Sequence, residues 1–154
     1  MLRSRIAAGL FAALPVLLLA AALAAHTGAR FYRGEIAAST SWDGVIRLTG
    51  AVVVREGVTV TVEPGTEILV QPGTGAAIVV RGRFIVRGTP AKPVVFDTAG
   101  GCAEGPWGGI VFERGSSGIL ENARIRCSAR GIGGDVSGVT AAGAVVEPPA
   151  RAGR

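Results

Sequence analysis

Two hydrophobic patterns divide the chain. From Ile6 to Ala25 no charged or polar side chain interrupts an apolar run. Beyond Trp42 the apolar residues occur in short β-branched runs, separated by Gly and Pro-Gly, with no helical periodicity. The first pattern predicts a hydrophobic helix, and the second predicts a series of short strands joined by tight turns.

The apolar run is typical of an export signal. Arg3 and Arg5 precede it, and an A-x-A-like cleavage site occupies residues 22–24. The run is also long enough for a membrane span, which takes about 20 residues. Arg30 and Arg33 follow it, so the flanking charges do not fix an orientation. We expect either a cleaved signal peptide or an uncleaved inner-membrane anchor, with the remainder exported to the periplasm, the cell surface or the medium.

The expected strands are each too short to be stable alone. They are Val45–Leu48, Ala51–Val54, Val58–Val62, Glu67–Val70, Ala77–Val80, Phe84–Val86, Val94–Phe96, Gly109–Phe112 and Ile119–Ile125. The composition agrees with thin stacked strands, since 49% of the residues are hydrophobic, 24 are Gly and only 5% are aromatic. A length of 154 residues leaves room for one modest domain.

A repeat links these strands. Segment 54–66 matches segment 80–90, because in both a Val-Arg pair and a Gly precede an apolar run that ends before Gly-Thr. The offset is about 26 residues. A second match pairs Trp42–Ile46 with Trp107–Val111. A period in this range predicts a solenoid in which like residues stack over like and each coil buries its apolar side chains on its neighbours.

The order of the repeated pieces resembles the opening coils of bacterial right-handed parallel β-helix repeat proteins. The pieces are Gly44–Gly50, Gly57–Thr66, Ile85–Thr89, Pro93–Phe96 and Trp107–Ile110, within a likeness that covers roughly Ser41 to Gly131. The resemblance implies an extracytoplasmic solenoid. It implies no single activity, because this fold hosts lyases, hydrolases, adhesins and assembly parts.

The predicted fold is therefore all-β: a short right-handed parallel β-helix preceded by an N-terminal hydrophobic helix. We assign residues 1–25 to the signal peptide or anchor, 26–41 to a linker or N-cap, 42–135 to the β-helix and 136–154 to a Gly/Ala/Pro-rich tail. The repeat decays after Gly131. We expect the C-terminal end of the helix to be open, frayed or covered by a partner, or the chain to be a fragment of a longer protein.

The two cysteines, Cys102 and Cys127, lie in the exported part, where oxidising conditions favour a disulfide. If the strands that precede them lie on equivalent sides of successive coils, the two thiols come together. The bridge would then hold the inserted loop 99–106 to the next coil. The alternative is two free thiols. We expect no metal site or cofactor, because the one histidine, His26, lies at the edge of the targeting segment.

Five residues are candidates for a ligand-contact surface. Trp42 and Trp107 could form a platform on which sugars stack, or could pack inside two corners of the helix. Arg55 and Arg81 are separated by the repeat offset, and Arg83 lies beside them. Their guanidinium groups could contact an acidic polysaccharide or lipid headgroups, or form an ordinary solvated face.

No catalytic constellation is visible. The aspartates, Asp43, Asp97 and Asp135, are far apart, and glycoside cleavage takes two carboxylates at one bond. No Gly-x-Ser-x-Gly motif is present. The net charge of +5 comes almost wholly from arginines that do not cluster with aromatic residues, so we expect no nucleic-acid binding.

We therefore expect an envelope module that is structural or serves an interaction, and not an enzyme. Its partners would be a polysaccharide, another envelope protein, or a second copy through the open C-terminal coil, with the membrane as a further partner if the N-terminal segment stays uncleaved. The alternative is a truncated or degenerate carbohydrate-active β-helix enzyme related to polysaccharide lyases or hydrolases.

Overall fold

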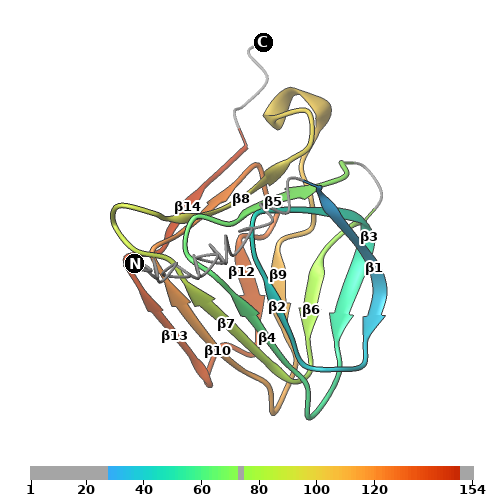
Figure 1. The fold of residues 1–154 in the computed structure, drawn as a ribbon, viewed down its shortest axis with the longest axis vertical. Coiled ribbons are helices and arrows are strands. Elements are labelled where there is room, and N and C mark those ends of the chain that lie inside the picture. The colour runs from blue at the N-terminus through green and yellow to red at the C-terminus, as the bar shows by residue number, and fades with distance from the viewer. Residues whose placement is uncertain (1–27, 73–74, 150–154) are drawn as a thin grey trace, which may run out of the picture.

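Short parallel strands build the fold, arranged as successive coils (Figure 1). The computed structural model describes residues 28–72 and 75–149, so the expected N-terminal helix lies outside the described residues. The strands are β1 Arg30–Ile36, β2 Thr40–Trp42, β3 Val45–Val54, β4 Thr59–Val62, β5 Glu67–Val70, β6 Ile78–Val80, β7 Arg83–Arg87, β8 Val94–Thr98, β9 Ile110–Phe112, β10 Ser117–Glu121, β11 Ala123–Arg126, β12 Ile132–Gly134, β13 Val139–Ala142 and β14 Val145–Glu147. One 3-10 turn, η1 Cys102–Glu104, interrupts them.

The strands form three parallel ladders, and each full coil contributes one rung to each. In the first ladder, the N-terminal halves of β1 and β3 are followed by β5, β8, β11 and β14. In the second, the C-terminal halves of β1 and β3 are followed by β6, β9 and β12. The third runs β2, β4, β7, β10 and β13. The fold is an all-β parallel β-helix, as predicted; β3 passes from one ladder to the next as a single strand where two were expected.

Inward side chains stack in columns along the ladders. One column of the first ladder runs Ile46, Ile68, Phe96 and Ile125, and each of the four side chains is fully buried. Rings from several columns also meet, in the order Tyr32, Trp42, Phe84, Phe96 and Trp107, with centroids 5.1 to 6.3 Å apart. The core is therefore a narrow stack of apolar rows, filled by aliphatic side chains and a run of aromatic rings.

The register confirms the first repeat match. Val54 pairs with Val80, and Val60 pairs with Phe84. The expected strand Ile119–Ile125 is instead two strands, because Asn122 takes a left-handed conformation with φ of 47° and turns the chain between β10 and β11. Its side-chain amide donates a hydrogen bond of 3.0 Å to the carbonyl of Gly88 in the preceding coil, so Asn122 has a structural role at this corner.

Strands also occupy segments where we expected a linker and a tail. β1 and β2 lie within 26–42, and β13 and β14 lie within 136–154. β1 is mostly exposed, and it pairs with β3 through backbone hydrogen bonds, so it lacks the alternation that marks a buried strand. β13 and β14 are short and mostly exposed, and they pair with β10 and β11.

Because the coils are stacked closely, a methyl group added at a glycine between two coils should destabilise the fold. A Cβ at Gly82 would overlap the carbonyl oxygens of Arg55 and Val58, whereas a Cβ at Gly133 would meet no atom within 4 Å. We expect Gly82→Ala to lower the free energy of unfolding by about 1–3 kcal/mol, as overpacking does. Gly133→Ala should change it by less than about 0.5 kcal/mol. Denaturant unfolding of both variants checks the difference, and equal effects would contradict this packing.

Candidate functional site

The two tryptophans are core residues. Trp42 ends β2, pairs with Val62 and is 0% exposed, and Trp107 forms a bridge with Ser128 and is 1% exposed. The indole N–H of Trp107 donates to the carbonyl of Arg126 at 2.7 Å. The two residues therefore stand in different ladders, and the expectation that they occupy matching positions is wrong. Neither presents a ring to solvent, so neither is a sugar-stacking platform in this structure.

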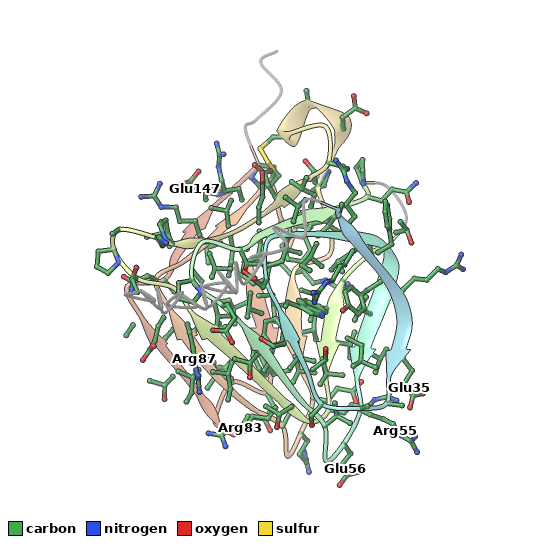
Figure 2. All side chains as sticks on the ribbon, in the orientation of Figure 1. Glu35, Arg55, Glu56, Arg83, Arg87 and Glu147 are labelled. Carbon is green, nitrogen blue, oxygen red and sulfur yellow. A yellow bond between two sulfur atoms is a disulfide. The ribbon has the colours of Figure 1, made fainter. Side chains whose placement is uncertain are left out.

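The predicted arginine row is interrupted by acidic partners. Arg55 and Arg81 follow the paired residues Val54 and Val80, so they do lie on one corner of successive coils. Arg55 pairs with Glu35 at 2.9 Å, and Arg81 pairs with Glu113 at 2.8 Å. Figure 2 labels the side chains of Glu35 and Arg55, which lie on the same side of the molecule. The third residue of this corner row, after Phe112, is Glu113 itself.

The hydrogen bond from Arg81 to Glu113 raises the pKa of the guanidinium, and both side chains stay exposed. Arg83 lies apart from this row, at the start of β7, where its neighbours in the ladder are Thr59 and Ser117. The three arginines thus do not form the continuous basic stripe that a polyanion would favour.

A second charged row, which the sequence did not reveal, crosses the outer face of the first ladder. The guanidinium of Arg126 on β11 contacts Asp97 on β8 at 3.2 Å and Glu147 on β14 at 3.0 Å. The three residues are 29 and 21 positions apart in sequence, and only the register brings them together. The row ties three successive coils at the C-terminal half of the helix.

The disulfide between Cys102 and Cys127 is confirmed, with their Cα atoms 5.0 Å apart. Cys102 belongs to η1 in the inserted loop 99–106, and Cys127 is fully buried directly after β11. The backbone carbonyl of Cys127 also accepts a hydrogen bond from the N–H of Trp107 at 3.0 Å. The bridge therefore fixes the loop to the next coil, in the way the sequence predicted, and Asp97 lies beside both sulfurs.

The last coil leaves core positions open. Val146 continues the column of Ile125, but Val146 is 44% exposed whereas Ile125 is fully buried. In the same coil Val145, which pairs with the outward Arg124, is 51% exposed, and Val136, between β12 and β13, is 47% exposed. Within residues 28–72 and 75–149, β12, β13 and β14 each pair with another strand on one side only. This coil combines free backbone edges with exposed apolar side chains, the two features that promote strand pairing with another molecule.

Comparison with known proteins agrees with this architecture. The model of the pectate-lyase-like β-helix domain matches residues 34–140, which is most of the chain. The chain belongs to the pectate-lyase-like β-helix family. No curated protein and no solved structure matches it.

Two shallow hollows mark the surface of this pectate-lyase-like β-helix. One, of about 240 Å³, is lined by Thr89, Pro90, Pro93, Asn122, Arg124, Gly143 and Val145; the other, of about 180 Å³, is lined by Phe31, Arg47, Leu48, Thr49, Leu69, Gln71 and Ala99. Neither lining includes a carboxylate, so neither has the two acidic groups that glycoside hydrolysis needs. Phe31, 66% exposed, is the aromatic residue that sequence reasoning missed, because its strand was expected to be a linker.

The expected membrane-spanning helix has no counterpart among the described residues. No helix among residues 28–72 and 75–149 is long and apolar enough to cross a membrane. The predicted signal peptide or anchor lies at 1–25, outside these residues.

Reducing the disulfide should destabilise the fold. Closing a loop of 25 residues is worth about 3.5 kcal/mol in the chain-entropy model. We therefore expect the reduced chain to lose roughly 3 kcal/mol of unfolding free energy in denaturant titrations. The Cys102→Ser, Cys127→Ser double variant is the control, because a reductant should leave its stability unchanged. A loss below about 1 kcal/mol on reduction would contradict a stapling role.

Asp135 gives a second, pH-dependent test. The hydroxyl of Ser137 donates to its carboxylate at 2.7 Å and lowers the pKa of Asp135, with help from the Ser137 backbone N–H at 3.2 Å. A lowered folded pKa stabilises the turn above the ordinary carboxyl pKa, and this contribution disappears as the pH falls through the folded value. Ser137→Ala should raise the pKa of Asp135 in an NMR titration. Ser41→Ala, which removes a hydroxyl bound to Glu63, should leave it unchanged.

Proposed function

We propose that this chain is an exported structural module of the cell envelope, a right-handed β-helix that associates through its last coil. The observation that carries the proposal is the inward column that ends in Val146, 44% exposed, after four fully buried residues. A core position left open to water is costly, at about 25 cal/mol per Å² of apolar surface. Covering it is a driving force for association.

A second copy of the chain is the partner that the geometry favours. The inward residues of the first coil, Trp42 and Ile36, are 0% and 9% exposed, so that end of the core is already covered. Head-to-tail stacking would therefore leave the last coil without an apolar counterpart. Two last coils facing each other bury the same surface twice, which gives a closed two-fold dimer and not an open filament.

Polysaccharide binding is a second candidate, and one observation favours it. Phe31 is 66% exposed and stands directly beside Arg47 in the ladder, at the hollow of about 180 Å³. An exposed ring next to a guanidinium is a common arrangement for holding a sugar ring with an acidic substituent.

An acidic side chain introduced into the last coil should prevent dimer formation. We expect the full chain in mild detergent to be a dimer by light scattering, and Val146→Asp to be monomeric, since an unpaired carboxylate in the covered core is strongly unfavourable. Val45→Asp is the matched control, because Val45 is 37% exposed on the same ladder but in an early coil, and this variant should stay dimeric. A monomeric parent chain, or a Val146→Asp dimer of unchanged affinity, would refute the proposed association.

A further inference from the structure

We propose that the corner that holds the disulfide becomes a binding site for one divalent metal ion when the disulfide is reduced. Asp97, Cys102 and Cys127, which we call the cysteine corner, place one carboxylate oxygen and two sulfurs within 4.8 Å of one another. Two thiolates and a carboxylate form a set that Zn²⁺ accepts in a tetrahedral site. The inference is independent of the proposed dimer.

Burial favours this corner. Cys127 is fully buried, and the side chain of Asp97 is only 15% exposed. Three protein ligands leave the fourth position of a tetrahedral site to a water molecule.

The backbone allows the sulfurs to separate to metal-ligand distances, which are about 2.3 Å from sulfur to Zn²⁺. Cys127 is anchored by β11 and by the hydrogen bond from Trp107. Cys102 lies instead in the inserted loop between Gly101 and Gly105, whose φ angles are 76° and 109°. Because glycine moves easily among such conformations, Cys102 is the ligand that adjusts.

The neighbouring charges permit Asp97 to leave Arg126 and bind a metal ion. Arg126 binds both Asp97 and Glu147, so it keeps one carboxylate partner when Asp97 turns to a metal ion. Two thiolates and a carboxylate carry one negative charge more than a divalent ion neutralises, and the nearby guanidinium offsets it.

A dithiol can reduce the disulfide between Cys102 and Cys127 in a balanced reaction. The dithiol gives two electrons and two protons, the protein S–S bond breaks to give two thiols, and the dithiol becomes a disulfide. Metal binding then releases both thiol protons. The ion would restore the link between loop 99–106 and the next coil that reduction removes.

Cobalt titration tests the site, since Co²⁺ is a coloured substitute for Zn²⁺ that prefers similar ligands. The full chain is reduced with a trialkylphosphine, which takes an oxygen atom from water, and is kept free of oxygen and excess reductant. We expect one equivalent of Co²⁺ to bind with a thiolate-to-cobalt charge-transfer band, which Zn²⁺ abolishes. The oxidised chain should show no such band. Absence of the band in the reduced chain would overturn the proposal.

Variants that retain both cysteines test whether Asp97 is a metal ligand or whether the two adjacent thiols bind the metal without it. Asp97→Asn should weaken Co²⁺ binding at least about tenfold, because even the outer partners of metal ligands contribute roughly 10–100-fold. Glu113→Gln, which removes the carboxylate bound to Arg81 on another corner row, should leave the affinity unchanged. Circular dichroism confirms that each variant is folded. Equal affinities of Asp97→Asn and the parent chain would refute the three-ligand site.

Discussion

Each coil of this protein depends on its neighbours for its strand hydrogen bonds and for the burial of its inward side chains. All pairings among the described strands join different coils, and all are parallel. A strand such as β6, with only three residues, is stable because β3 and β9 flank it and because Ile78 is stacked between Val52 and Ile110. Stability in such an arrangement is a sum over neighbouring coils, so the two ends set its limits.

The two ends differ in how they meet this constraint. Trp42 and Ile36 close the core at the first coil, whereas Val146 leaves it open at the last. Side-chain links join the coils at both ends. Arg55 binds Glu35 between the first coils, and near the open end the disulfide joins loop 99–106 to the corner after β11. Arg126 connects β8 to β14, which pairs on one side only, and so it supports the surface we propose for association.

Sequence patterns predicted those features that depend on the repeat. Val54 and Val80 do stack, Glu67–Val70 is a strand with the expected bounds, and the cysteines form the bridge that their places after successive strands indicated. The patterns failed where similar local sequence occurs in different ladders. The Trp-x-Gly pieces that begin at Trp42 and Trp107 look alike, but Trp42 ends a strand of the third ladder and Trp107 precedes a strand of the second.

Register explains the remaining misses. The contact of Arg126 with Asp97 spans 29 residues and appears only when β8 and β11 are aligned, as does the approach of Asp97 to the cysteines. β1 was missed because it is held by backbone pairing on an edge, which leaves no hydrophobic alternation in its side chains. The exposure of Val146 likewise follows from its place in the stack and not from its local sequence.

Hydrogen–deuterium exchange of the full chain at increasing protein concentration tests the central claim most directly. If the last coils of two chains cover each other, the amides of β13 and β14 exchange more slowly as concentration rises, while those of the inner strands β5 and β7 keep the same rates. Exchange of β13 and β14 that is independent of concentration across the whole range would contradict the account.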